Sequence, residues 1–150
     1  MHKHMYQDEV SMKFLRSLKA ERQKLKMTQK DLSIKIGRDK RSILRYERGC
    51  ALPTLDILMK LAVIFGCDLS SSLNYRYYHG EIKSETIKRN LADYGLTYQE
   101  VGRLTGRGKE TVRRAANLCG HSSLECLSLV LDVIDAERKA EKFRRKLLAR

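Results

Sequence analysis

The chain has 150 residues, 42% of them hydrophobic, and a formal net charge of +13. This composition excludes wholesale disorder, and the length suits one ordinary domain or two very small ones. Residues 1–69 carry 15 Lys and Arg against 8 Asp and Glu, and residues 70–150 carry 16 against 10. Because each half is basic by itself, we expect nucleic acid as the first partner to consider and an anionic protein surface as the second.

The patterns of several other protein classes are missing. The N-terminus MHKHMYQDEV has no apolar core typical of a signal peptide, and the longest apolar runs, such as LAVIFGC, are too short to span a membrane. The cysteines have no C-x-x-C spacing and no paired histidines nearby, so no metal or other cofactor is expected. No Ser/His/Asp set, carboxylate pair or phosphate loop indicates an enzyme. We therefore expect a cytoplasmic protein that has no catalytic function and no membrane contact.

The first half of the chain is predicted to be helical. Residues 11–26 carry apolar side chains at helical spacing. Thr28 and Asp31 form a helix-start signal, and Gly37 ends the short helix that follows because it tolerates positive φ. Asp39 can then cap the next helix. No alternating pattern typical of a strand competes with this interpretation.

The segment GRDKRSILRYERG, residues 37–49, sorts its side chains onto two faces when it is read as a helix. One face carries Ile43, Tyr46 and Glu47. The other face carries Lys40, Arg41, Leu44, Arg45 and Arg48. A solvated helix normally mixes charges of both signs on its outer face, whereas this face is mostly positive. The pattern indicates a helix that meets a negatively charged partner.

The sequence matches itself after a shift of 69 residues. The segment 28–65 aligns without gaps to 97–134, so that Gly37 meets Gly106 and Ile43 meets Val112. A shared register of buried, turn and basic positions indicates two copies of one supersecondary unit. We therefore predict an all-α protein with two small helical domains in tandem and an extended C-terminal helix. Their expected bounds are 1–73 and 85–150, joined by a linker over 74–84 where Ser, Asn and Gly interrupt the apolar spacing.

The second copy repeats the start and turn signals of the first. Thr97 and Glu100 form a capping box, Gly106 stands at the turn, and Ser123 can cap a later helix as Thr54 does in the first copy. The C-terminal segment AERKAEKFRRKLLAR leaves two interpretations open. It is either a basic tail that holds phosphates or an amphipathic end that pairs with its own copy, with Phe143 and Leu147 inward.

Two short helices around a glycine, with buried positions fixed on either side, form a helix-turn-helix. Residues 28–58 fit the pattern T-Q-x-[DE]-L-[small]-x-x-x-G-x-x-x-x-x-I-x-x-[YW]-E-x-G followed by P-[ST]-L-[DE]-x-L. In this pattern the chain resembles the Cro/C1-type (XRE) repressor family over roughly residues 11–73. The second copy is a divergent version of the same unit.

The resemblance implies a role for each polar position of the first unit. The base-reading residues would be Lys40, Arg41, Leu44 and Arg45. The phosphate contacts would be Gln29, Arg38 and Arg48. Arg22 and Glu47 would form a structural ion pair between helices and would not contact DNA. At the corresponding places of the second unit stand Leu91 and Ala116, an apolar pair in place of a charged one.

The second unit departs further from the family pattern. The positions that would read bases there are Lys109, Glu110, Arg113 and Arg114, and Arg107 would contact a phosphate. Tyr98 stands where the first unit has Gln29, and Gly108 stands where it has the Asp39 cap. This unit either binds DNA or has become a structural unit that pairs with another protein chain.

The resemblance predicts a sequence-specific regulator of transcription that binds double-stranded DNA as a homodimer in a prokaryotic cytoplasm. A repressor of phage or mobile-element type is the main hypothesis. One alternative is a phage-type inhibitor that binds a nucleic-acid enzyme such as a CRISPR nuclease. Another alternative is an antitoxin, in which the second domain holds a protein partner.

Overall fold

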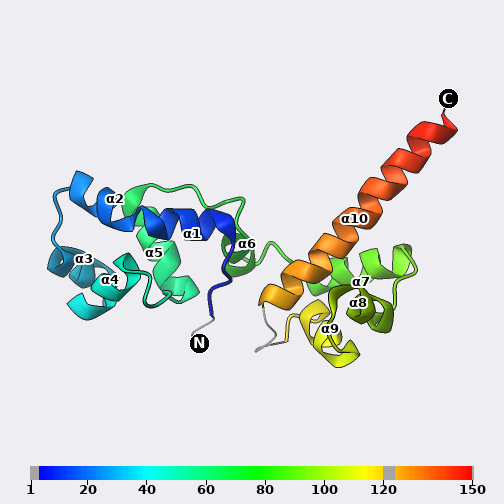
Figure 1. Ribbon diagram of the computed structural model, residues 1–150, viewed down its shortest axis with the longest axis horizontal. Helices are drawn as coiled ribbons and strands as arrows, with labels where there is room; N and C mark the ends of the chain where they lie inside the picture. The colour runs from blue at the N-terminus through cyan, green and yellow to red at the C-terminus, as the bar shows by residue number, and fades with distance from the viewer. Residues whose placement is uncertain (1–3, 120–123, 150) are drawn as a thin grey trace. The chain divides into compact units, whose positions relative to one another are not determined.

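A computed structural model describes residues 4–119 and 124–149 of the chain. The described residues form ten α-helices and no strand, which confirms the predicted all-α class (Figure 1). They divide into two compact units, one over residues 1–81 and the other over residues 82–150. No helix in the described part of the chain is both long and apolar enough to cross a membrane.

The first unit is built from six short helices around one apolar core. These are α1 (Glu9–Arg16), α2 (Leu18–Lys24), α3 (Gln29–Ile36), α4 (Lys40–Glu47), α5 (Leu55–Phe65) and α6 (Leu73–Tyr78). Side chains from α2 to α5 meet at the centre with no more than 1% of their surface exposed, among them Leu18, Leu32, Ile43, Leu58 and Leu61. The helix expected over residues 11–26 is divided at Ser17, whose Oγ donates a hydrogen bond to the carbonyl of Phe14 at 2.7 Å.

The segment expected to link the two units begins inside the first unit. Residues 74–78 belong to α6, which packs on α5, and Asn74 is completely buried. The Asn74 amide nitrogen donates to the Tyr6 carbonyl at 2.6 Å, while its oxygen accepts from the Tyr6 backbone N–H at 2.6 Å. The same nitrogen donates to Asp8 and Ser11. Because this amide forms hydrogen bonds with the N-terminal segment, the polar residues around Asn74 pack as part of the first unit and do not form a free linker.

The second unit consists of α7 (Ser84–Asp93), α8 (Tyr98–Thr105), α9 (Lys109–Ala116) and α10 (Leu124–Leu148). The bounds of α8 and α9 lie 69 residues after those of α3 and α4 at both ends. Gly37 and Gly106 both have φ of 70°, and each stands in the turn between the two helices. The cap expected at Ser123 lies outside the described residues.

The core of the second unit lies where α7, α8 and α9 meet the first half of α10. Its fully or almost fully buried side chains are Ile87, Leu91, Val101, Val112, Ala115, Ala116, Cys126, Leu127, Val130 and Ile134. Leu91 and Ala116 are 2% and 0% exposed, and their helices α7 and α9 are in contact. The two positions that replace the Arg22–Glu47 pair are therefore both in the interior.

Candidate nucleic-acid interface

The turn between α3 and α4 is fixed by caps on both helices. Thr28 and Asp31 form a reciprocal capping box, with the Asp31 N–H donating to Thr28 Oγ1 at 3.0 Å and the Thr28 N–H donating to Asp31 Oδ2 at 2.9 Å. Gly37 ends α3 in the left-handed conformation. Asp39 then caps α4 by accepting hydrogen bonds from the Ser42 hydroxyl and backbone N–H. These bonds lower the pKa of Asp39, so its carboxylate stays charged at the start of α4.

Helix α4 buries one face and presents the other. Ile43 is completely buried, and Tyr46 packs against the same core. On the opposite side Lys40, Arg41 and Arg45 are exposed, and Leu44 is half-buried among them. The structure thus brings all four predicted base-reading residues of the first unit onto the outer surface of one helix.

Arg38 and Arg48 are exposed just before and just after α4. Within the described part of the chain, neither of these side chains nor Lys40, Arg41 or Arg45 lies within 4.0 Å of a carboxylate oxygen in an ion pair. Five positive charges around one short helix therefore form no ion pair, although the Asp39 carboxylate is near enough to Arg41 and Arg45 for their charge to help lower its pKa. Such a surface attracts a polyanion and retains its charge for that contact.

A buried ion pair joins α4 to the rest of the unit. Arg22 donates from Nε to Glu47 Oε1 at 2.5 Å and from Nη2 to Glu47 Oε2 at 3.3 Å. Its Nη1 donates to the carbonyl of Met27 at 2.8 Å, a contact that the sequence does not signal because every residue has such an acceptor. The side chains of Arg22 and Glu47 are only 10% and 3% exposed. The pair therefore lies in the interior of the unit, where it connects two helices, and it is not available to DNA.

Gln29 takes part in this cluster. Its amide nitrogen donates to Glu47 Oε2 at 3.0 Å, so the side chain expected at a phosphate is held against the end of α4. Burial by itself would raise the pKa of Glu47, but the hydrogen bonds from Arg22 and Gln29 and the positive charge of Arg22 outweigh burial, and the pKa is lowered. Glu47 is therefore ionised and connects α2, α3 and α4.

The corresponding turn of the second unit is less well capped, and only the Thr97 half of the predicted capping box is formed among the described residues. Thr97 accepts a hydrogen bond from the Glu100 N–H at 3.1 Å, whereas Gly108 provides no side chain to cap α9. Gly102 is buried where α8 meets this turn, and a Cβ there would lie 2.6 Å from the backbone carbonyl oxygen of Arg107. The close approach of the backbone explains why a glycine stands inside α8.

The basic face of the second unit is partly neutralised by its own carboxylates. Glu110 forms a close ion pair with Arg113 and lies 4.0 Å from Nε of Arg114. Arg107 donates from Nη2 to Glu125 on α10 at 3.2 Å. The predicted residues Lys109, Glu110, Arg113 and Arg114 do lie together on exposed positions of α9. However, fewer of their charges are free than on α4.

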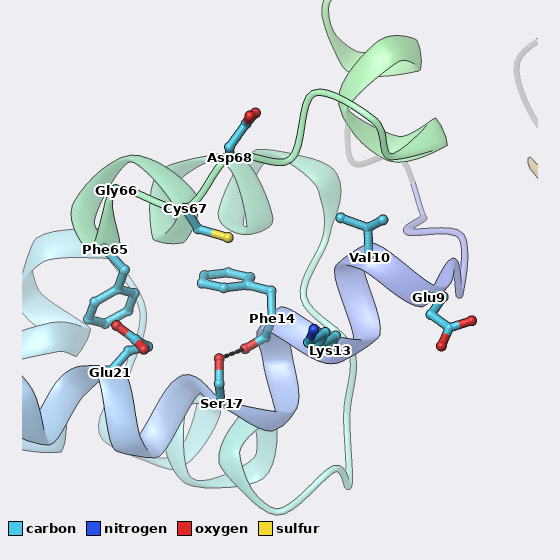
Figure 2. Close-up of a pocket in the computed structure, with 10 residues that line it drawn as sticks. All are labelled: Glu9, Val10, Lys13, Phe14, Ser17, Glu21, Phe65, Gly66, Cys67 and Asp68. Carbon is cyan, nitrogen blue, oxygen red and sulfur yellow. Dashed lines mark hydrogen bonds between the residues drawn. The ribbon is translucent and has the colours of Figure 1, made fainter.

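A hollow of about 640 Å³ lies on another side of the first unit, between α1 and the end of α5 (Figure 2). Phe14, Phe65 and Cys67 provide its apolar surface, and the charged side chains that line it are the acidic Glu9, Glu21 and Asp68 and the basic Lys13. Burial raises the pKa of the Cys67 thiol, so that this sulfur is less prone to react as a thiolate. Its acidic surroundings make the hollow unsuited to a polyanion. Among the described residues, no group of three His, Cys, Asp or Glu side chains is placed to hold a metal.

One family model of known proteins matches most of the first unit. The HTH_3 family model, described as helix-turn-helix, matches residues 18–71 and therefore covers α2 to α5 with the turn that presents α4. No curated protein and no solved structure gave a significant match to the chain.

Proposed function

We propose that this chain, in which residues 18–71 form a DNA-binding helix-turn-helix of the XRE type, is a sequence-specific repressor of transcription. The observation that carries the proposal is the outer surface of α4, where five basic side chains lie on the exposed face and at the two ends of the helix, and none of them forms an ion pair in the described part of the chain. A repressor needs only to occupy its operator, and a small helical unit with this surface is sufficient for that task.

The roles of the side chains follow from how such a helix enters the major groove. Lys40, Arg41 and Arg45 lie on the exposed face of α4 and are proposed to read base edges, since Arg and Lys pair with the O6 and N7 acceptors of guanine. Leu44 is half-buried beside them and is proposed to contact a thymine methyl group. Arg38 and Arg48, at the two ends of the helix, are proposed to hold phosphates and fix the register.

Gln29 supports this surface in a different way from that expected. Because one N–H of its amide is bonded to Glu47, we propose that Gln29 positions α4 and offers a phosphate its second amide N–H, beside the free backbone N–H groups at the start of α3. The oxygen accepts hydrogen bonds and does not attract an anion. The second amide N–H of Gln29 and the backbone N–H groups are therefore the proposed donors.

For the second unit we propose a weaker contact with DNA, mainly through phosphates. Arg113 and Arg114 share Glu110, and Arg107 is joined to Glu125, so these cations must leave a carboxylate before they meet DNA. A cation that exchanges a carboxylate for a phosphate gains less binding free energy than a cation that had no ion-pair partner before it met the phosphate. The same pairing favours the second candidate function, in which this unit binds a protein such as a nuclease or a toxin while the first unit controls its own operon.

Selection from a random pool of duplex DNA tests the proposal. The full chain should enrich one defined site, and the variant Arg41→Ala/Arg45→Ala should enrich none. The matched variant Arg113→Ala/Arg114→Ala removes the same two charges from α9 and should still enrich the core of that site. If the full chain enriches no sequence at moderate salt, the repressor proposal fails. If only the α9 variant loses enrichment, the reading helix has been assigned to the wrong unit.

A further inference from the structure

Helix α10 continues well past the unit that it helps to build. Ile134 is its last buried residue, yet the helix runs on to Leu148 and extends beyond α7, α8 and α9 (Figure 1). Phe143 and Leu147 in this free part are 63% and 50% exposed. A solitary helical segment of this length is marginally stable in water, and most helices in proteins are stabilised by packing an apolar face. The free half of α10 has such a face without a partner in its own unit.

Apart from Leu124, Leu131 and Leu148, the apolar residues of α10 outside the core follow one line along the helix. Their spacing alternates strictly between four and three residues, which is the seam of a two-stranded coiled coil. We call this line the α10 seam, and it consists of Leu129, Val133, Ala136, Ala140, Phe143 and Leu147. The first two are half-buried and the other four are exposed. On the opposite side of the free half lie the ion pairs Arg138–Asp135 and Arg145–Glu141, as expected of a face that stays in water.

Charges beside the seam differ between its two ends. The positions that flank the seam on either side are acidic early in the helix, at Asp132 and Glu137, and basic later, at Lys139, Arg144 and Lys146. In a parallel pair of identical helices, Asp132 would lie beside the partner's Glu137, and Lys139 beside the partner's Arg144. Both contacts join like charges. An antiparallel pair sets Asp132 near the partner's Lys146 on each side, and its like-charge contacts are confined to the two-fold axis, where Glu137 meets the partner's Glu137 and Lys139 meets the partner's Lys139. The antiparallel pair therefore has fewer contacts between like charges than the parallel pair.

We propose that α10 binds α10 of a second copy of this chain as an antiparallel two-helix coiled coil. Leu129 then faces the partner's Leu147, Val133 faces the partner's Phe143, and Ala136 faces the partner's Ala140. Large residues meet at both ends and small ones at the centre, over about 27 Å of helix. Asp132 lies near the partner's Lys146 on each side. The contact is closed by a two-fold axis, so it makes a dimer and no longer assembly.

This interface is independent of whether the chain binds DNA, because none of its residues lies on α4. Its test therefore uses the full chain without nucleic acid, in sedimentation or light-scattering measurements of mass against concentration. The chain should be a dimer. Leu147→Asp, which puts a charge into the seam, should weaken dimerisation by about tenfold or more. Leu148→Asp is the matched control, because Leu148 is 87% exposed and lies off the seam, and it should leave the dimer unchanged.

Charge exchange tests the antiparallel direction. Asp132→Lys should weaken the dimer, since the introduced ammonium group meets the partner's Lys146, and adding Lys146→Asp should restore it. In a parallel dimer Asp132→Lys would instead strengthen association by relieving the repulsion of Asp132 from the partner's Glu137. The proposal is overturned by a monomeric full chain, by equal losses in the Leu147 and Leu148 variants, or by a stronger dimer with Asp132→Lys. Helical content by circular dichroism shows that each variant is folded.

Discussion

The Arg22 guanidinium and the Glu47 carboxylate form a buried ion pair in which Nε lies 2.5 Å from Oε1. Through this pair α2 holds the end of α4, and through Gln29 the same carboxylate holds the start of α3. The orientation of the basic helix thus depends on an ionised group in the interior. The second unit fills the corresponding places with Leu91 and Ala116, both buried.

Breaking this pair should cost more than replacing it. Arg22→Leu leaves the Glu47 charge buried with one amide donor, and we expect the first unit to lose about 3–5 kcal/mol in its free energy of unfolding. Arg22→Leu/Glu47→Ala copies the second unit and should lose clearly less than Arg22→Leu alone. Urea unfolding of the three proteins measures the difference. A double variant that loses as much stability as Arg22→Leu, or more, would contradict the cost of leaving the Glu47 charge unpaired.

The ionised state of Glu47 should appear in the acid stability of the first unit. Its pKa in the folded chain lies below the ordinary value of 4.5, so it stabilises the fold above pH 4.5 and this contribution is lost as the pH falls through the lowered pKa. Glu47→Gln cannot titrate and should therefore unfold with a shallower dependence on pH below 4.5. Thermal unfolding of both proteins over this range is the measurement. Parallel curves would mean that another carboxylate controls the acid transition.

Two glycines of the second unit should respond in opposite directions to substitution. Gly102→Ala would normally favour a helix, but its Cβ would lie 2.6 Å from the Arg107 carbonyl oxygen, so we expect a loss of about 1–3 kcal/mol in stability. Gly108→Asp is the matched control. Position 108 has φ of −70° and ψ of 152°, and it has room for a side chain. An aspartate there can cap α9 and should stabilise the unit by about 0.5–1 kcal/mol. Thermal unfolding separates the two effects, and stabilisation by Gly102→Ala would contradict the close approach.

Substitution of a base-reading residue and substitution of a phosphate-binding residue should have different effects on the salt dependence of DNA affinity. On the enriched duplex, Arg41→Ala should cost about 1–3 kcal/mol and relax the preference at one base pair. Arg38→Ala should weaken binding to all sequences and reduce the slope of log affinity against log salt by about 1. Arg76→Ala, an exposed arginine on α6, removes the same charge elsewhere and is the control. Identical salt slopes and specificities for all three would show that only net charge matters.

Much of the first unit follows from local sequence signals. Thr28 and Asp31 determine where α3 begins, Gly37 where it ends, and Asp39 where α4 begins, because each satisfies a backbone requirement that few other residues can meet. The apolar spacing then decides which face of α4 is buried. Local chemistry therefore predicts the position and the outward face of the basic helix.

Features that depend on distant parts of the chain were not predictable in this way. The run around Asn74 resembles a linker in composition, and its burial becomes evident only when Tyr6 and Asp8 are placed beside it. Gln29 is equally suited to a phosphate and to a carboxylate, and the choice depends on the position of Glu47. In each case a polar side chain has several possible partners, and only the fold selects one.

Methylation interference on the enriched site tests the central claim, that α4 reads bases in the major groove, most directly. Guanine N7 is the major-groove acceptor that Arg and Lys contact, and a methyl group there blocks the bond. The full chain should be excluded by methylation at specific guanines, and Arg41→Ala or Arg45→Ala should abolish the effect at one of them while leaving the others. Binding that is indifferent to N7 methylation, or a pattern unchanged in both variants, would contradict the account.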